Sequence, residues 1–324
     1  MQANKRKLIG MLALAPLVPG LVHAADEVWP TRPINMVVPY PAGGGPDQIA
    51  RQLCMVLGPL LKTSFVVSNK PGASGMLGLN EVGQSAPNGY VATYFSSAQL
   101  SVQASGAGQN FDILKSIQPI SQFTTNSYVL VVARNSPHQR LEQLLAAIQK
   151  SPGALNYGSA GVGSPAHLAM EYLRAAVPGL EALHVPYKGA VEAITALRSS
   201  QIDFSFALVA AALPQINSGD LRALAVTSVK RLDVLPDVRS FDEAGIRNYA
   251  YGTWGGLGLR AGTPKPIVDR FFAAVQTAVR DPQFQTYCKS VGTGIELSAS
   301  PAAFSEMMRL ALIEEEKTVK RLKL

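Results

Sequence analysis

Apolar and polar positions follow one another along the chain in the order of short strands and longer helices. Residues 34–38 are a mostly apolar run, which predicts a buried strand, and residues 49–60 carry apolar side chains at helical spacing. The apolar runs 65–67 and 90–96 predict two further strands. Strand, helix and strand in this order indicate βαβ units around a largely parallel sheet, so this part of the chain is expected to be α/β.

The same order begins again in the middle of the chain. Residues 128–132 predict a strand, residues 141–149 an amphipathic helix, and residues 155–159 a strand that leads into a glycine-rich loop. Ser164 and Pro165 predict the start of the next helix, because serine is a favoured N-cap and proline suits the first helical position. A second α/β lobe is therefore expected.

The C-terminal segments become helical again after a glycine-rich strand at 252–259. A chain that ends by rejoining its first unit crosses twice between two lobes. We therefore predict a discontinuous lobe 1 made of residues 25–124 and 251–324, a lobe 2 made of residues 125–250, and a ligand cleft between them. The two crossings are the expected hinge.

The first 24 residues have the pattern of a secretory signal peptide. Three basic residues at 5–7 precede an apolar run at 8–22, and the segment closes on the small-x-small sequence Val22-His23-Ala24. Two prolines interrupt the run, which is shorter than the roughly 20 residues that a spanning helix needs. We predict cleavage near Ala24 and a periplasmic location.

Composition and charge exclude several classes of partner. Removal of the signal peptide takes away three positive residues and no acid, which lowers the formal net charge from +7 to +4. The remaining basic residues are scattered, so nucleic-acid binding is not expected. Two cysteines and four histidines are also scattered, so neither a metal nor a cofactor is expected. Cys54 and Cys288 could form a disulfide or remain separate core thiols, because sequence does not show whether their β-carbons approach.

Three loops share one form, in which an apolar strand leads through glycine into the start of a helix. They lie at 40–47, 157–165 and 187–190. A helix N-terminus presents free N–H groups and a partial positive charge, and glycine allows a ligand to approach the backbone. The hydroxyls of Ser97 and Ser159 add further donors for an anion. A carboxylate fits better than a phosphate, since no Gly-Lys-Ser/Thr sequence is present, and facing loops from two lobes favour a dicarboxylate.

Single residues in these loops have structural alternatives. Asp47 stabilises the start of its helix whether or not a ligand is near. Lys188 could neutralise a carboxylate or lie solvated at the surface. His167 could contact a ligand or serve only the fold, and Tyr40 could close over a solute or pack in the core.

The sequence argues against an enzyme without excluding one. No Gly-x-Ser-x-Gly sequence occurs, and Ser74 lacks the second glycine at the right offset. A hydrolase assembled from distant residues remains the alternative class.

The chain resembles the Bug-type receptors, the substrate-binding subunits of tripartite tricarboxylate transporters. The similarity extends over essentially the whole mature chain in several motifs, which lie at 29–47, 69–75, 87–90, 155–161, 184–189, 219–227 and 261–264. It implies a two-lobed periplasmic-binding-protein architecture of type II-like form. It also implies a monomeric, non-catalytic receptor that carries a small carboxylate to inner-membrane transporter subunits. A sensor subunit that reports the ligand to a signalling partner would have the same receptor chemistry and stays an alternative.

The resemblance also implies that the loops around 42–47 and 159–164 hold a carboxylate through backbone N–H groups and water. Many relatives carry an acidic or amide side chain near the position of Ala207, where this chain is apolar. That departure favours a dicarboxylate that is not an amino acid, an aromatic one such as terephthalate included. The residues expected to contact the ligand are Tyr40, Ala42, Gly43, Gly44, Gly45, Pro46, Asp47, Ser97, Ser159, Ala160, Gly161, Gly163, Ser164, His167, Lys188 and Ala207.

Overall fold

A computed structural model describes residues 29–106, 111–247 and 249–322 of the chain. The predicted signal peptide therefore lies outside the described residues. Within these ranges no helix is both long and apolar enough to cross a membrane.

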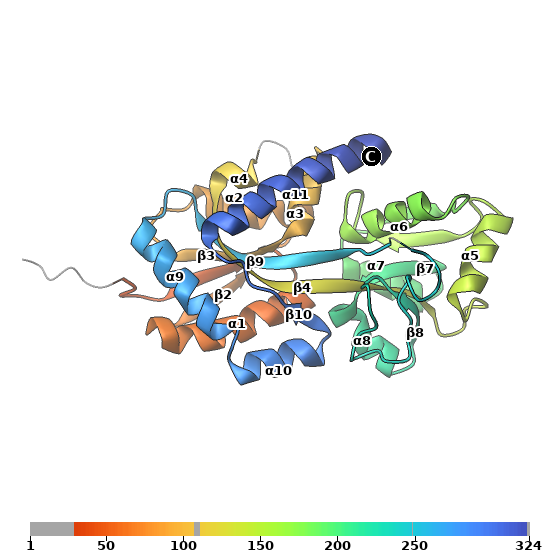
Figure 1. Cartoon of the computed structure of the whole chain (residues 1–324), viewed down its shortest axis with the longest axis horizontal. Coiled ribbons are helices and arrows are strands. Elements are labelled where there is room, and N and C mark those ends of the chain that lie inside the picture. The colour runs from red at the N-terminus through yellow and green to blue at the C-terminus, as the bar shows by residue number, and fades with distance from the viewer. Residues whose placement is uncertain (1–28, 107–110, 248, 323–324) are drawn as a thin grey trace, which may run out of the picture.

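Strands and helices alternate from the first described element to the last (Figure 1). The strands are β1 (Ile34–Val38), β2 (Phe65–Asn69), β3 (Val91–Ser96), β4 (Ile117–Ala133), β5 (Asn156–Ser159), β6 (Leu183–Pro186), β7 (Phe204–Leu208), β8 (Leu221–Val226), β9 (Gly252–Arg260) and β10 (Thr293–Ile295). The helices are α1 (Gly45–Leu61), α2 (Met76–Gln84), α3 (Ser97–Ala104), α4 (Ile113–Ser116), α5 (Leu141–Lys150), α6 (Pro165–Ala176), α7 (Ala190–Arg198), α8 (Val209–Asn217), α9 (Lys265–Ala278), α10 (Pro282–Ser290) and α11 (Pro301–Leu322), with a 3₁₀ turn at Ala73–Gly75.

The molecule is a two-lobed α/β protein whose strands are ordered β2-β1-β3-β9-β4-β7-β5-β6. The predicted βαβ units are present, because β1 lies parallel to β2 and β3, and β5 lies parallel to β6 and β7. The centre differs from the expected parallel sheet. There β9 and β4 pair antiparallel with each other, β9 pairs antiparallel with β3, and β4 with β7.

The long strand β4 belongs to both lobes. Its first part pairs with β9 as far as Ser127, and from Tyr128 onward it pairs with β7 and β8. The end of α11 also reaches the second lobe, where the hydroxyl of Tyr172 donates a hydrogen bond to Thr318 Oγ1 at 3.2 Å. Figure 1 shows β4, β9 and α11 extending from one lobe towards the other.

The hydrophobic core is divided between the lobes, and in each lobe it lies on both faces of the sheet. In lobe 1, Met36 of β1 packs with α1 and α9, whereas its neighbour Val37 packs with α2 and α11. In lobe 2, Leu130 of β4 packs with α5 and α6, whereas Val129 packs with α7 and α8. This alternation follows from the two-residue period of a strand. Since Phe123 and Tyr128 belong to different clusters, we propose that the first crossing between the lobes lies near 124/125. The second crossing at 250/251 stays a prediction, and Tyr251 still packs against the cluster of lobe 2.

Cys54 and Cys288 are both buried and both free, so the structure contains no disulfide between them. Burial raises the pKa of each thiol to about 12. The structure therefore contains two separate core thiols and not the disulfide that was the other alternative.

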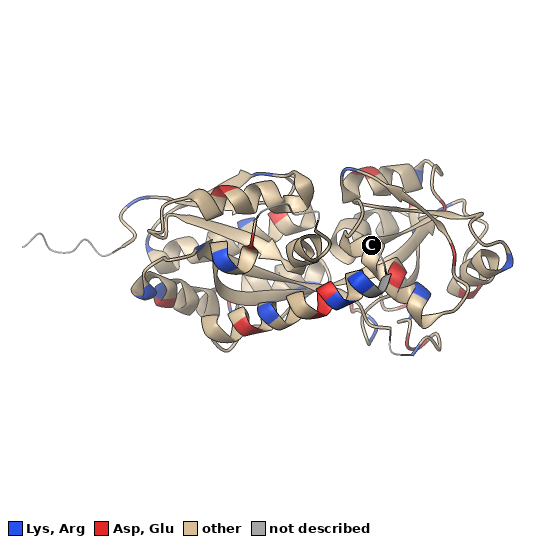
Figure 2. Cartoon of the chain, turned by 90° about the horizontal axis from the view of Figure 1, so that it is seen from above, with Lys and Arg blue, Asp and Glu red and all other residues tan. Residues whose placement is uncertain are grey.

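Charged residues are mixed in sign over both lobes. Figure 2 shows basic and acidic segments side by side on the outer helices, and most clearly along α11. Several are neutralised locally, as in the ion pair between Arg309 and Glu306 on α11. In the described part of the chain, no three His, Cys, Asp or Glu side chains form a group that could hold a metal ion.

Candidate functional site

The first glycine loop connects β1 to α1 and is fastened by Asp47. This residue is 1% exposed. Its Oδ2 accepts hydrogen bonds from Gly43 N at 2.8 Å and from Arg51 Nε at 3.0 Å, and its Oδ1 accepts from Asn69 Nδ2 at 2.8 Å. Burial alone would raise the pKa of the Asp47 carboxyl, but these donors outweigh burial and lower it. The carboxylate is therefore ionised, and both of its oxygens accept hydrogen bonds within lobe 1.

Tyr40 stands at the start of the same loop. Its hydroxyl lies 2.7 Å from Ser96 Oγ and within 3.2 Å of the side-chain amide of Gln99. The amide of Gln99 also donates to the carbonyl of Ser74 at 3.1 Å, so the loop is tied to α3 and to the 3₁₀ turn. Burial raises the pKa of Tyr40, although the two hydrogen bonds oppose the shift. The neighbouring Ser97 accepts a hydrogen bond from Trp254 N at 3.4 Å.

The second glycine loop connects β5 to α6 and is built from neutral groups. Ser159 Oγ donates to Gly161 O at 2.9 Å and accepts from Gly161 N at 3.1 Å. Gly161 and Gly163 have φ values of +109° and +75°, a region that favours glycine. These turns bring the chain to Ser164, which precedes Pro165 at the start of α6.

Ser164 is the unusual member of this loop. The residue is 2% exposed, yet its Oγ has no hydrogen-bond partner among the described residues. It stands at the N-cap position of α6 but makes no side-chain cap. A buried hydroxyl without a partner is costly, since desolvation is not repaid. Its place at the N-terminus of a twelve-residue helix is where an anion would supply that partner.

Two histidines lie behind the second loop. Gly163 N donates to Nδ1 of His167 at 3.0 Å, and Nε2 of His184 lies 2.7 Å from Ser159 Oγ. The two imidazole rings are stacked, with centroids 4.2 Å apart and planes inclined by 7°.

Each loop approaches the opposite lobe through a glycine. A β-carbon on Gly45 would lie 3.3 Å from Ala210 Cβ and 3.5 Å from Leu208 Cδ2 of lobe 2. A β-carbon on Gly163 would lie 3.1 Å from Ser105 Oγ of lobe 1. Both glycine loops therefore lie where lobe 1 meets lobe 2.

Lys188 lies next to the second loop, because the preceding Tyr187 N donates to Ser159 O at 2.9 Å, whereas Ala207 lies in the core of lobe 2. Lys188 is exposed, and its backbone N–H donates to Glu192 at 3.2 Å. Ala207 is 4% exposed and packs with Val129 and other core residues of lobe 2. Strand alternation turns the next residue, Leu208, towards the first loop instead. The apolar side chains that approach that loop are thus those of Leu208 and Ala210.

The remaining expected residues are distributed along the two loops. Ala42 and Gly43 are exposed, whereas Gly44, Gly45, Pro46, Ala160 and Gly161 are partly buried. The partners Arg51, Asn69, Gln99 and His184 are not among the residues expected to contact the ligand. They are 4, 22, 59 and 25 residues from the groups they contact. Only the i,i+4 spacing of Asp47 and Arg51 on one helix face could have indicated a contact from the sequence.

A serine beside a histidine is also the arrangement that a hydrolase requires. Ser159 does not suit the role of nucleophile, because its hydroxyl proton is donated to Gly161 O and not to the neighbouring histidine. The ring of His184 is stacked on His167 and on Tyr157, 4.9 Å away. Among the described residues, this pair is held as part of the loop rather than presented to a substrate.

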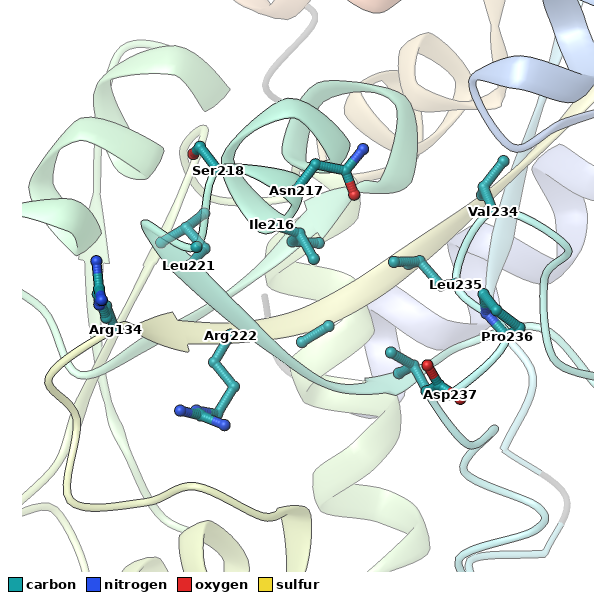
Figure 3. A pocket seen from close by; sticks show the side chains of 13 residues that line it. Arg134, Ile216, Asn217, Ser218, Leu221, Arg222, Val234, Leu235, Pro236 and Asp237 are labelled. Atoms are coloured by element: carbon teal, nitrogen blue, oxygen red, sulfur yellow. The ribbon is translucent and has the colours of Figure 1, made fainter.

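A cavity of about 530 Å³ lies in lobe 2 away from both loops. Its lining comes from the end of α8, the start of β8 and the segment 234–238, and it includes Arg134, Arg222 and Asp237 (Figure 3). None of the residues expected to contact the ligand lines it.

The two lobes and the glycine loops between them define a solute-binding protein of the periplasmic-binding-protein fold. The chain belongs to the tripartite tricarboxylate transporter family receptors, whose family model matches residues 49–320. The resemblance to Bug-type receptors is thereby confirmed. This is a family of solute receptors.

Relatives support the same assignment. Protein BugT of Bordetella pertussis is 31% identical over 269 residues, 82% of each chain. The structure of periplasmic binding protein BugD has a TM-score of 0.82 at 31% identity and covers 91% of this chain and 99% of its own. MatC from Rhodopseudomonas palustris, with bound malate, has a TM-score of 0.81 at 25% identity over 90% of this chain and 100% of its own. A second R. palustris structure, with adipate, has a TM-score of 0.82 at 25% identity over 91% of this chain and 98% of its own.

Proposed function

We propose that the protein is a periplasmic receptor that captures a dicarboxylate between its two glycine loops and delivers it to an inner-membrane tripartite tricarboxylate transporter. The observation that carries this proposal is the buried, unpartnered hydroxyl of Ser164 at the N-terminus of α6. A carboxylate oxygen there would accept from this hydroxyl and from the free backbone N–H groups in the first turn of α6. No catalytic step is part of the proposal.

The two loops contribute differently to the proposed ligand site. The second loop receives one carboxylate at Ser164. The N-terminus of α1 offers backbone donors to the other carboxylate, which must approach beside Gly45, because Asp47 accepts from Gly43 N and Pro41 O accepts from Gly44 N at 3.4 Å. Two relatives of the same fold were solved with malate and adipate, which are both dicarboxylates. This supports an anionic group at each end of the ligand.

Apolar contacts near the first loop favour a ligand without an ammonium group. Leu208 and Ala210, whose side chains approach the first loop, offer no acceptor to such a cation. The proposed ligand is therefore a dicarboxylate that is not an amino acid, with a hydrocarbon or aromatic body, and terephthalate is one candidate.

The proposal is tested by thermal unfolding of the purified receptor, refolded to remove carried-over ligand, against aliphatic and aromatic mono-, di- and tricarboxylates. A ligand at 100 times its Kd adds about 2.7 kcal/mol, which should raise the midpoint by about 5–10 °C. We expect a shift of this size for dicarboxylates, with the compound recovered unchanged. Tightest binding of glutamate or aspartate would contradict the apolar-body assignment. No shift with any carboxylate would contradict the receptor site itself, and recovery of a cleaved compound would favour a hydrolase.

A further inference from the structure

His167 and His184 come from different elements and form one fixed unit behind the second loop. His167 is on α6 and His184 is on β6, and their ring centroids are 4.2 Å apart. Tyr157 of β5 extends the stack at 4.9 Å from His184, and Phe204 of β7 lies 5.6 Å from Tyr157. The rings are therefore held from four elements of lobe 2, while the loop lies at one edge of the stack.

The hydrogen bonds assign a protonation state to each ring. Nδ1 of His167 accepts from Gly163 N at 3.0 Å, so this nitrogen carries no proton. The hydroxyl proton of Ser159 is donated to Gly161 O at 2.9 Å, so at the 2.7 Å contact His184 Nε2 is the donor. This assignment gives Ser159 Oγ one donated and two accepted hydrogen bonds, which is its full capacity. Protonation of His167 at Nδ1 would break the bond to Gly163.

We propose that His167 and His184 are positioning residues, which as neutral imidazoles hold the 159–164 loop in the geometry that receives a carboxylate. This inference rests on the proposed function. His167 fixes Gly163, the residue directly before Ser164, and His184 fixes Ser159, where the loop leaves β5. The histidines thus provide geometry rather than positive charge, and the anion is bound by hydroxyl and N–H dipoles.

The surroundings keep the pair neutral. The charged groups that face it are Glu171 and Arg174 of α6, which are themselves joined at 3.0 Å. Burial, with a smaller effect of Arg174, lowers the pKa of His167 to about 4. Burial lowers the pKa of His184 to about 4. Repulsion from a protonated His167 adds to this shift, and Glu171 opposes it. Two rings in direct stacking contact also disfavour a second charge on the pair.

The test compares two replacements of His167 with one of a histidine outside the pair. His167→Leu removes the acceptor for Gly163 N, and we expect about tenfold weaker binding of the best dicarboxylate. His167→Asn offers an amide oxygen near the position of Nδ1 and should stay within about threefold of the wild type. His138→Leu is the control, because His138 lies on the connection before α5, and it should bind as the wild type does. Unchanged affinity in His167→Leu would overturn the proposal.

A second measurement does not depend on the ligand or on a variant that folds. Imidazole ¹⁵N spectra of the wild-type chain should show both rings protonated at Nε2 alone, without titration between about pH 8 and pH 5. Exchange of the Gly163 amide should be slow. Titration of either ring near pH 6.5 would overturn the positioning role. If the rings behave as expected but no carboxylate binds, the proposed function fails while the assignment of the pair stands.

Discussion

The two glycine loops have the same order of strand, turn and helix, but they are fastened by opposite means. The first loop is held by a charge, since the carboxylate of Asp47 collects donors from Gly43, Arg51 and Asn69. The second is held by neutral groups, which are the Ser159 hydroxyl and the two stacked histidines. The first loop therefore already has an anion, the Asp47 carboxylate, at the start of its helix. The second loop has at that place the Ser164 hydroxyl, which has no partner among the described residues.

This difference shows that a glycine-rich helix start is not by itself an anion site. At α1 the positive end of the helix is partly compensated by Asp47, so a ligand carboxylate there meets a like charge nearby. At α6 no acidic residue stands in the first turn. We therefore expect the second loop to provide the stronger contact, and the predictions that follow test this asymmetry.

The largest effect is expected from Asp47→Ala. The change leaves three donors around a buried position without their acceptor, so we expect the free energy of unfolding to fall by about 3 kcal/mol. Denaturant unfolding of the variant and the wild type measures the difference. Asp237→Ala is the matched control, because Asp237 is exposed, and it should change stability by less than about 0.5 kcal/mol. Equal stability of both variants would mean that the first loop is not held by charge.

Ser164→Ala should separate ligand binding from stability. Without ligand the serine makes no cap and its buried hydroxyl has no partner, so its loss should leave the free energy of unfolding unchanged or raise it by about 1 kcal/mol. A hydrogen bond to a charged group contributes about 1.5–3 kcal/mol, so dicarboxylate binding should weaken by about 10- to 100-fold. Calorimetric titration measures the affinity. A loss of stability without a loss of affinity would make Ser164 a structural residue and would remove the main support for the second loop as the stronger site.

Acid should loosen the second loop before the first. The folded-state pKa of His167 and His184 is about 4, below the ordinary value of 6.5. Between these two pH values the unfolded chain binds more protons than the folded chain. The contribution of the neutral histidine pair to the free energy of unfolding is therefore complete above about pH 6.5 and is lost as the pH falls towards 4. The lowered pKa of Asp47 acts in a lower range, since its contribution is lost only below its ordinary value of 3.8. We expect the midpoint temperature to fall by about 5 °C between pH 6.5 and pH 4. His167→Asn should reduce this slope, and an identical slope in that variant would contradict the assignment.

The sequence was informative wherever a local rule acts. Asp47 and Pro165 mark helix starts that the structure contains, and the apolar run of β1 and the helical spacing of α1 correspond to their buried faces. It was not informative about contacts between distant segments. Nothing in the local pattern relates Asn69 to Asp47 or His184 to Ser159, because these contacts depend on how parallel strands are ordered in the folded sheet.

The central sheet shows the same limit. Rules for βαβ units predicted parallel strands, but a chain that returns from lobe 2 brings β9 in beside β3 and β4 in the opposite direction. Side-chain direction was a further limit. Ala207 directly precedes Leu208 on β7, and only Leu208 approaches the first loop. The methyl group of Ala207 lies in the core, because a step of one residue along a strand reverses the face.

The smallest effect is expected from Gly45→Ala, which changes only the contact between the first loop and lobe 2. Gly45 has no positive φ, so Gly45→Ala keeps the backbone, but the new methyl group lies 3.3 Å from Ala210 Cβ across the lobes. The lobes must separate by a few tenths of an ångström. We expect dicarboxylate affinity to fall by about two- to threefold, with stability within about 0.5 kcal/mol of the wild type.

Ala210→Gly removes the atom that the new methyl group contacts, so a double mutant measures the coupling between the two positions. The glycine costs about 1 kcal/mol of stability within α8, but the double variant should regain the affinity of Ala210→Gly alone. Titration of the four proteins with one dicarboxylate gives the coupling directly. Recovery of affinity in the double variant would mean that the lobes contact each other between the start of α1 and the start of α8 when the ligand is bound. Additive losses would mean instead that Gly45 acts through its own loop, and the first loop would then contribute more to binding than the charge of Asp47 allows.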